Sequence, residues 1–324
     1  MVETLPIDCF RLLDRIDEGT FGIVYRAEDL QTGKIVALKQ LRYVTLDTES
    51  SSPHLREISV LLELDHPNIL PLYAVVAGSS IFDNVYLCTD FYPYDLLHLI
   101  TYYKRMLNTH VPLNITKFII KELAKGLHYL HSHDILHRDI KPSNIFLSPP
   151  LTVVLGDFGS AKVSEVVGTM TPGVTTLGYK APEMLLGDTN YTNAVDMFSL
   201  GCVFAQLVTG EALFETGYEL GDLGCMIDIM GSVDEVKWPG LSNLPGSQGV
   251  VLGKSVKKGR LVELIGDLLD YEGYQILSSL LSWNPEHRPS AHQIINSSWF
   301  SSADSELPEI PVEFFFEFCD VHAS

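Results

Sequence analysis

The sequence predicts an α+β protein in which a small β-rich part precedes a larger, mainly helical part. Short apolar segments separated by glycine-bearing turns dominate residues 10–45. Apolar residues at helical spacing take over after about residue 95. The chain has 324 residues, of which 46% are hydrophobic, which is enough for two structural units or one large bilobal unit with a real core.

Three strands are expected first, over residues 10–16, 23–27 and 35–41. They are rich in Val, Ile and aromatic residues, and the turns through residues 17–22 and 31–33 carry glycine. An antiparallel meander is the natural interpretation of this pattern.

A helix is expected after the meander. Pro53 suits a first helical position, apolar residues recur at helical spacing between 55 and 62, and His66-Pro67 would end the helix. Two further strands are expected near residues 69–77 and 84–89.

Two long helices and an acidic tail stand out in the second part. Residues 115–130 carry an apolar stripe on a helix of about 18 residues. Residues 194–208 are apolar on nearly every side, which indicates a buried helix. Beyond Arg288 the chain has no Lys or Arg, six acidic residues and the aromatic run 314–316. We expect this tail to pack back on the protein, and a partner-binding segment is the alternative.

Composition excludes several classes of protein. The 22 Lys and Arg against 41 Asp and Glu give a formal net charge of −19, which argues against binding to nucleic acids or anionic membranes. The five cysteines are scattered without a C-x-x-C pair, which disfavours a disulfide framework or a zinc knuckle. No apolar run approaches the roughly 18–20 residues of a membrane span, and the first residues lack a secretory signal pattern. We therefore expect an intracellular protein of the nucleus, the cytoplasm or both.

The first motif with chemical meaning is the turn 18–24, Glu-Gly-Thr-Phe-Gly-Ile-Val. Its glycines would let the backbone approach a phosphate closely, although a plain hairpin turn explains them equally well. Lys39 ends the third strand, and Glu57 lies on the following helix. Each alone fits a solvated surface residue, but a lysine aimed at phosphates needs an anion such as Glu57 to hold it.

Further polar side chains cluster in the segment His137-Arg-Asp-Ile-Lys-Pro-Ser-Asn144. Asp139, Lys141 and Asn144 could activate a hydroxyl and bind a metal ion. Asp157, which begins the tripeptide Asp-Phe-Gly, would complete a hard oxygen site for Mg²⁺. Each segment by itself also fits an ordinary polar turn.

In this order and at these spacings, the motifs resemble the signature of eukaryotic protein kinases. The resemblance covers about residues 10–300. It rests on Gly19, Gly22 and Val24, Val-Ala-Leu-Lys39, Glu57, His-Arg-Asp139 with Asn144, Asp157-Phe-Gly, Ala181-Pro-Glu183, Asp196 and Arg288. Within that family, residues 55–59, 64–68 and 234–239 resemble the cyclin-dependent kinase branch.

The resemblance implies a bilobal protein kinase fold. It divides the chain into a β-rich N-lobe with one regulatory helix (1–89), a hinge (90–94), a mainly α-helical C-lobe (95–300) and the acidic tail (301–324). It also implies an enzyme that uses ATP and Mg²⁺ to phosphorylate Ser or Thr of proteins in cell-cycle or transcription control.

The catalytic roles are implied residue by residue. Asp139 would accept the proton of the attacking hydroxyl, and Lys141 would stabilise charge on the transferred phosphoryl group. Asn144 and Asp157 would bind the two Mg²⁺ ions. Such a set fits phosphoryl transfer, which needs positioning and charge neutralisation more than covalent catalysis.

A nucleotide site is implied in the same way. Lys39 would bind the α- and β-phosphates, and Glu57 would hold Lys39. The other implied nucleotide-site residues are Glu18, Gly19 and Gly22 over the phosphates, Val24, Ala37 and Phe146 around adenine, Thr89 as gatekeeper, Asp90 and Tyr92 in the hinge, and Asp95 at the ribose. An apolar column of Leu61, Leu72, His137 and Phe158 would link the lobes.

Two regulatory phosphorylation sites follow from the resemblance. Thr171 aligns with the activation-loop threonine, and Thr20 aligns with an inhibitory site whose usual tyrosine neighbour is Phe21 here. Because a phosphate dianion needs several cationic donors to order a loop, phosphorylated Thr171 would sit in a basic pocket. That pocket would consist of Arg56, Arg138 and Lys162.

The chain also departs from the family pattern. Asp17 replaces the first glycine of the Gly-rich turn, which predicts weakened or restructured ATP binding. Gly178 and Lys180 stand where a tryptophan and an arginine are usual. Because lysine cannot reproduce the planar contacts of arginine, we do not expect a strict requirement for proline after the target residue. A kinase that phosphorylates the activation loops of cyclin-dependent kinases is therefore one specific hypothesis.

The expected partners are a protein substrate and either a cyclin or a cyclin-dependent kinase. A pseudokinase scaffold is an alternative, favoured only by Asp17. A small-molecule kinase is a more distant one, because the region from Thr171 to Glu183 resembles a platform for protein substrates.

Overall fold

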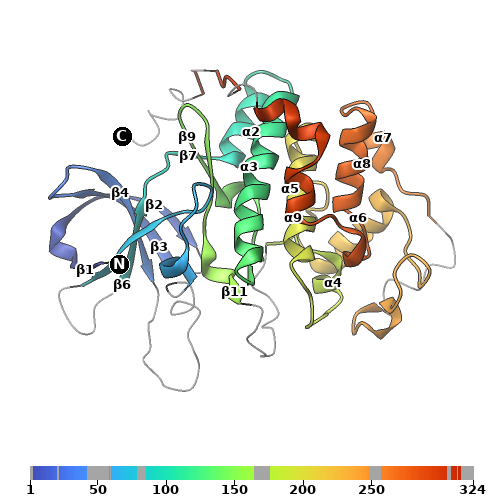
Figure 1. Ribbon diagram of the computed structural model, residues 1–324, viewed down its shortest axis with the longest axis horizontal. Helices are drawn as coiled ribbons and strands as arrows, with labels where there is room; N and C mark the ends of the chain where they lie inside the picture. The colour runs from blue at the N-terminus through green and yellow to red at the C-terminus, as the bar shows by residue number, and fades with distance from the viewer. Residues whose placement is uncertain are drawn as a thin grey trace.

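The computed structural model describes residues 3–19, 22–41, 58, 60–78, 85–163, 176–247, 257–304, 308–311 and 313–314. A six-stranded sheet gathers at one end of the molecule, and a group of helices fills the other (Figure 1). The expected α+β fold with two lobes is therefore confirmed.

The N-terminal sheet has the strand order β1-β5-β6-β4-β3-β2. Its strands are β1 (Glu3–Pro6), β2 (Phe10–Gly19), β3 (Gly22–Asp29), β4 (Ile35–Leu41), β5 (Leu72–Ala77) and β6 (Val85–Asp90). All neighbouring pairs are antiparallel except β1 with β5. The expected meander is thus present as β2, β3 and β4, and the two later strands are also found.

Two features of the sheet differ from expectation. β1 was not predicted, because it is a four-residue strand that ends in Pro6 and shows too short a pattern to read. β2 extends to Gly19, beyond the expected end at residue 16, and its pairing with β3 contains two register shifts. The expected helix near residues 55–62 is described only at residue 58 and residues 60–63, which are helical.

The C-terminal lobe is built mainly from helices. These are α2 (Leu96–Arg105), α3 (Leu113–Ser132), α4 (Pro182–Leu185), α5 (Ala194–Thr209), α6 (Glu219–Met230), α7 (Leu261–Ile265), α8 (Tyr271–Leu280) and α9 (Ala291–Ile295). The predicted amphipathic helix is α3, and the predicted buried helix is α5, in which every residue but the last is buried. No helix of the described residues is both long and apolar enough to cross a membrane.

Short strands and single turns of 3₁₀-helix position the loops of this lobe. The strands are β7 (Tyr94–Asp95), β8 (Ile135–Leu136), β9 (Ile145–Ser148), β10 (Thr152–Leu155) and β11 (Lys162–Val163). They form a three-stranded sheet, β10-β9-β7, and the pair β11-β8. The described 3₁₀ segments of this lobe are Pro142–Asn144, Phe158–Ser160, Leu241–Asn243, Pro285–His287 and the longer Ser298–Asp304, and a further segment, Ile7–Cys9, lies between β1 and β2 of the N-terminal sheet.

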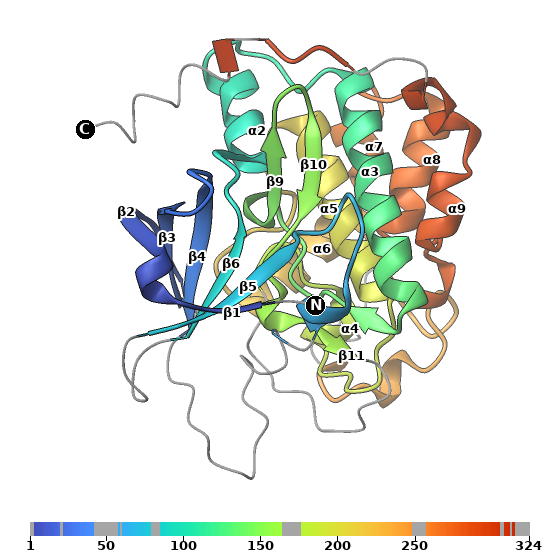
Figure 2. The same cartoon turned by 60° about the vertical axis from the view of Figure 1, so that its left-hand side comes forward.

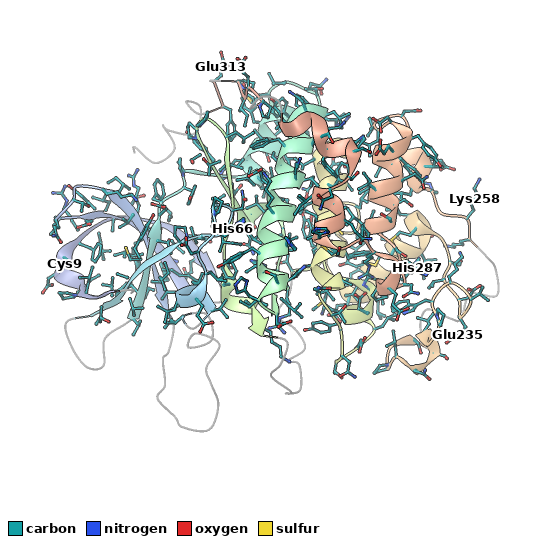
Figure 3. The ribbon with its side chains drawn as sticks, viewed as in Figure 1. Cys9, His66, Glu235, Lys258, His287 and Glu313 are labelled. Carbon is teal, nitrogen blue, oxygen red and sulfur yellow. The ribbon has the colours of Figure 1, made fainter. Side chains whose placement is uncertain are left out.

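The two lobes touch beside the β9–β10 hairpin, which faces β5 and β6 (Figure 2). The backbone N–H of Leu70 donates to the Leu155 carbonyl, and the N–H of Leu155 donates to the Asn68 carbonyl, each at 2.9 Å. The Asn68 side chain adds a 2.9 Å hydrogen bond to the carbonyl of Val153. His66 stacks on Tyr129 of α3 with ring centroids 4.9 Å apart, and Figure 3 places His66 at this junction.

Part of the acidic tail packs back on the helical lobe, as expected. Phe314 is fully buried, and its ring lies 4.9 Å from that of Tyr94 and 5.6 Å from that of Tyr102. The neighbouring Glu313 is exposed at the edge of the molecule (Figure 3). The rest of the aromatic run, Phe315 and Phe316, lies outside the described residues.

Candidate active site

A cavity of about 800 Å³ lies between the sheet and the helical lobe. The N-lobe lines it with residues of β2, β3, β4 and β6, and the C-lobe lines it with the loops around β9 and β10. Of the residues singled out from the sequence, the cavity is lined by Asp17, Gly22, Val24, Ala37, Lys39, Leu61, Thr89, Asp90, Tyr92, Asp95, Asp139, Lys141, Asn144, Phe146, Asp157 and Phe158.

Lys39 reaches across the cavity to the C-lobe. It lies on β4 between Val24 of β3 and Leu87 of β6, and its Nζ donates to Oδ1 of Asp157 at 2.8 Å. Burial raises the pKa of Asp157, but the charge and hydrogen bond of Lys39, with His137 and Lys141, outweigh burial and hold that pKa below its usual value. Asp157 is therefore a carboxylate at neutral pH.

A buried carboxylate of α5 fixes the loop that follows α3. Asp196 accepts hydrogen bonds from the backbone N–H groups of His137 at 3.0 Å and Arg138 at 2.8 Å, and its Oδ2 lies 2.9 Å from Nε2 of His131. Burial raises the pKa of Asp196, but these hydrogen bonds and the nearby histidines lower it overall. The loop is thereby held immediately before Asp139.

Asp139 is the centre of a network of polar groups. Its Oδ2 lies 3.0 Å from Nζ of Lys141 and accepts a 3.0 Å hydrogen bond from Nδ2 of Asn144. Its Oδ1 accepts a 3.1 Å hydrogen bond from the backbone N–H of Thr176. Nζ of Lys141 also donates to Oγ1 of Thr176 at 2.6 Å. A carboxylate and an ammonium group are thus oriented together toward the cavity.

Thr176 is the member of this network that sequence reasoning missed. It lies 37 residues from Asp139 and belongs to none of the motifs, so no spacing connects it with the loop. Its only sequence signal is its place five residues before Ala181, in the segment that precedes Ala-Pro-Glu.

Asn144 and Asp157 form a donor set that fits a hard cation. The Nδ2 group of Asn144 donates to the side chain and the carbonyl of Asp139, which leaves its Oδ1 as the atom for a metal. Asp157 uses Oδ1 for Lys39 and retains Oδ2. One amide oxygen and one carboxylate suit Mg²⁺, which takes a few protein oxygens and completes its shell with water and phosphate. No cluster of three or more His, Cys, Asp or Glu with metal-binding geometry occurs among the described residues.

The opposite end of the cavity is aromatic and acidic. The rings of Tyr92 and Phe146 are nearly parallel, at 14°, with centroids 6.0 Å apart. Asp95 caps the N-terminus of α2, where its Oδ1 accepts a hydrogen bond from the backbone N–H of His98 and lies 2.7 Å from Nδ1 of that residue. Asp90 binds Lys34 at 2.6 Å and also Tyr73. The carboxylates of Asp90 and Asp95 are therefore already engaged by side chains.

The glycine turn is described only in part. A Cβ on Gly22 would lie 2.0 Å from the carbonyl oxygen of Gln40, so the close approach of β3 to β4 requires glycine there. Glu18 pairs with Arg15. Asp17 and Gly22 line the cavity, and Glu18 does not.

Several predicted residues lie outside the described residues. They are Glu57, Arg56, Thr20 and Thr171. Of the predicted basic pocket, Arg138 donates to the Ser160 carbonyl at 2.6 Å and to the Tyr191 hydroxyl at 3.0 Å, and Lys162 lies on β11. The apolar column residues Leu61, Leu72, His137 and Phe158 are all buried. The ring centroids of His137 and Phe158 lie 5.0 Å apart.

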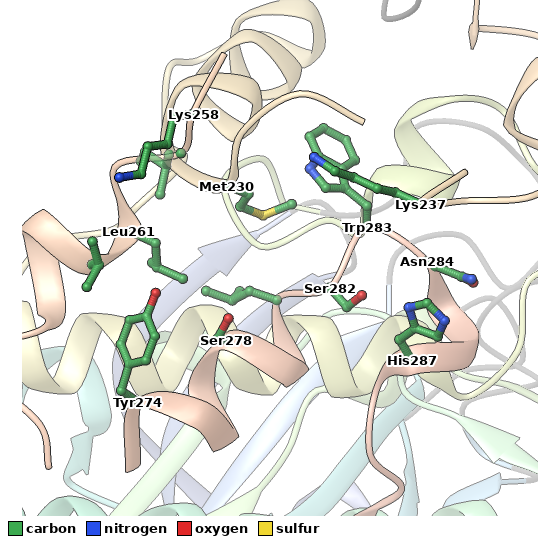
Figure 4. A pocket seen from close by; sticks show the side chains of 14 residues that line it. Met230, Lys237, Lys258, Leu261, Tyr274, Ser278, Ser282, Trp283, Asn284 and His287 are labelled. Atoms are coloured by element: carbon green, nitrogen blue, oxygen red, sulfur yellow. The ribbon is translucent and has the colours of Figure 1, made fainter. Parts of the chain in front are cut away.

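A second cavity of about 440 Å³ lies in the helical lobe, between α6, α7 and α8 (Figure 4). Lys237, Lys258 and His287 border it, with hydroxyl groups of Tyr274, Ser278 and Ser282 along one wall. Among the described residues that line it there is no carboxylate, so this cavity lacks the oxygen ligands that Asp139, Asn144 and Asp157 offer Mg²⁺ in the interlobe cavity. The interlobe cavity is therefore the candidate active site.

Comparison with known proteins agrees with this geometry. The protein kinase domain family model matches residues 10–300. The chain is 37% identical over 299 residues to cell division control protein 2 homolog 3 of Trypanosoma brucei brucei, covering 91% of this chain and 93% of that protein. It is 35% identical over 309 residues to cyclin-dependent kinase 11B and to cyclin-dependent kinase 11A of Homo sapiens, covering 95% of this chain but 38% of each of those proteins. With the cavity, the Asp139 network and these matches together, the chain belongs to the protein kinase family, among the kinases related to cyclin-dependent kinases.

Proposed function

We propose that this protein is an ATP-dependent serine/threonine kinase that transfers the γ-phosphoryl group of ATP to hydroxyl groups of other proteins. One observation carries the proposal. Asp139, Lys141, Asn144 and Thr176 form a single hydrogen-bonded group that faces the Lys39–Asp157 pair across one interlobe cavity.

In this proposal the residues of the chain position the substrate hydroxyl and the phosphates, and they neutralise negative charge on the transferred group. Asp139 accepts the proton of the substrate hydroxyl, since its carboxylate is held by three donors at a fixed place. Lys141 lies beside it and offsets negative charge on the transferred group. Lys39 extends across the cavity to Asp157 and binds phosphate oxygens. Mg²⁺ held by Asn144 and Asp157 would supply charge neutralisation at the phosphates.

The decisive experiment is a phosphorylation assay with Mg-ATP and a general protein substrate. Asp139→Asn keeps the size of the side chain but removes its capacity to accept a proton, so we expect activity to fall by about 100-fold or more. Phosphoamino acid analysis of the product should give phosphoserine and phosphothreonine. If wild type and Asp139→Asn are equally inactive although wild type binds Mg-ATP, the protein is a pseudokinase scaffold.

We further propose that the target residue need not be followed by proline. Lys180 is almost completely buried, and its Nζ donates to Oε1 of Glu219 on α6 at 2.7 Å. Gly178 donates its backbone N–H to Asp222 of the same helix at 2.8 Å. Gly178 and Lys180, which replace the usual tryptophan and arginine, therefore both form hydrogen bonds with side chains of α6.

Substrates that fit this proposal are the activation loops of cyclin-dependent kinases, whose target threonine lacks a following proline. A catalytically inactive cyclin-dependent kinase and a matched peptide pair, with and without proline after the target, would test it. Phosphorylation confined to the proline peptide would contradict the proposal.

Regulation by a cyclin and by phosphorylation of Thr171 is part of the same proposal. It is supported by the relationship to kinases that are named cyclin-dependent. Arg138, one of the three cationic residues of the predicted basic pocket, donates to the Ser160 carbonyl and the Tyr191 hydroxyl.

A further inference from the structure

Phe146 forms part of the floor of the interlobe cavity. It lies on β9, where its backbone pairs with Val154 of β10 on one side and Asp95 of β7 on the other. Its half-buried ring lines the cavity and is nearly parallel to that of Tyr92. The two rings together form an aromatic surface at the end of the cavity next to the hinge.

Gly156 lies directly behind this ring. A Cβ at Gly156 would lie 2.4 Å from Cε2 and 2.9 Å from Cδ2 of Phe146, and 3.2 Å from Cδ2 of Leu70. Carbon atoms do not approach within 3 Å without displacement, so a methyl group here and the present position of the ring exclude each other.

The backbone of Gly156 does not itself require glycine. Its φ angle is outside the left-handed region, unlike that of seven other glycines of the described residues. Its N–H donates to the carbonyl of Asn144, and its carbonyl accepts from Nε2 of His137, both at 2.9 Å. Any L-residue could adopt this conformation, so the phenyl ring is what demands a residue without a side chain.

The surroundings of Phe146 limit the direction in which its ring can move. Phe146 and Leu70 line the cavity, whereas Gly156 is not among the described lining residues, so a methyl group at residue 156 would press on the ring from outside the cavity. A methyl group at residue 156 would therefore move the ring into the space of a bound ligand, beside Tyr92 of the hinge.

We propose that Gly156 is a positioning residue of the nucleotide site. Because it has no side chain, the Phe146 ring can take the position in which it stacks against the purine base. The inference rests on the proposed function, because it takes ATP to be the occupant of the cavity. An aromatic ring favours flat heterocycles through offset stacking. Gly156 and Phe146 together therefore determine the affinity for the base and not for the phosphates.

The test is a double-mutant cycle on the full chain, with Gly156→Ala, Phe146→Leu and the double variant. Overpacking by one methyl group in a close-packed site corresponds to about a tenfold rise in the Kd for Mg-ATP in Gly156→Ala. Phe146→Leu should raise Kd about threefold through lost stacking. Since leucine makes room for the methyl group, the double variant should match Phe146→Leu alone.

Inorganic tripolyphosphate with Mg²⁺ distinguishes a base-specific effect from general damage to the fold. It carries the phosphates without a base, so its Kd should be the same, within about twofold, in wild type and Gly156→Ala. Equal weakening of tripolyphosphate and ATP, or additive effects in the double variant, would overturn the inference. If Gly156→Ala does not fold, the double variant should fold and bind ATP, and its failure to do so would equally overturn it.

The outcome for wild type separates this inference from the proposed function. A wild-type protein that binds neither Mg-ATP nor tripolyphosphate overturns both. A wild-type protein that binds Mg-ATP as tightly as Gly156→Ala overturns the role of Gly156 and leaves the kinase proposal intact.

Discussion

Several charged groups of the candidate active site are held by neighbouring side chains. Asp139 touches three donors, Lys39 touches Asp157, and Asp95 touches His98. Motif spacing predicts which charged groups take part, because the motifs carry them. It cannot predict Thr176 or the contact between Gly156 and Phe146, since each depends on how segments far apart in the sequence are packed.

The pair of Asp95 and His98 predicts a dependence of stability on pH. The hydrogen bond to Asp95 raises the pKa of His98, against the opposing effect of burial. A pKa raised in the folded protein means stabilisation that is complete below the unfolded value of about 6.5 and is lost as pH rises through the folded value.

We therefore expect His98→Ala to cost more stability at pH 6 than at pH 9. The His98 side chain is 42% exposed, so solvent screening limits the loss in the free energy of unfolding to about 0.5 kcal/mol at pH 6. Urea denaturation at the two pH values measures it. His287→Ala, at an exposed histidine of the 3₁₀ segment Pro285–His287, is the control. An equal loss of stability for His98→Ala at both pH values would contradict the prediction.

Among the secondary-structure elements, α5 organises the most distant parts of the site. It is buried along its length, its Asp196 holds the loop before Asp139, and its Ala194 carbonyl accepts a hydrogen bond from Arg288. Periodicity predicted α3 and α5 to within a few residues, because both have long and uniform apolar patterns. It missed β1, whose four residues carry no pattern and gain their structure from β5 alone.

The ion pair between Arg288 and Glu183 links α4 to the segment before α9. Both side chains are essentially inaccessible, and the two guanidinium nitrogens lie 2.6 and 2.8 Å from the two carboxylate oxygens. Removing one partner leaves a buried charge uncompensated, so Arg288→Leu should lower the free energy of unfolding by about 3–5 kcal/mol.

Equilibrium denaturation in urea measures this loss, and the chain contains a matched control. Arg260 and Glu263 form an exposed pair, with side chains 62% and 65% accessible. Arg260→Leu should therefore change stability by about 0.5 kcal/mol or less. Similar losses for the two variants would show that the buried pair contributes no more than a surface one.

On the scale of the whole molecule, the acidic tail is joined to the hinge region. Phe314 fills a site between Tyr94 of β7 and Tyr102 of α2, more than 200 residues earlier in the chain. Composition predicted that an aromatic run in a folded protein packs inward. It could not predict the site, because any exposed apolar groove would serve that run equally well.

Truncation of this anchor should destabilise the folded protein. Phe314→Ala removes a fully buried ring, and we expect a loss of about 3 kcal/mol in the free energy of unfolding. Glu313→Ala, at the exposed neighbour, should have almost no effect. Thermal denaturation of both variants checks the difference, and equal melting temperatures would show that the ring contributes nothing.

The backbone contact of Asn68 and Leu70 with Leu155 has a mechanical consequence. The lobes are joined covalently where β6 runs into β7, and they are joined again, without a covalent bond, at this contact. A motion of the lobes that keeps both connections is a rotation about the line between them, and it requires the Lys39–Asp157 pair across the cavity to separate. Sideways sliding of one lobe over the other would in addition have to break the hydrogen bonds to Leu155.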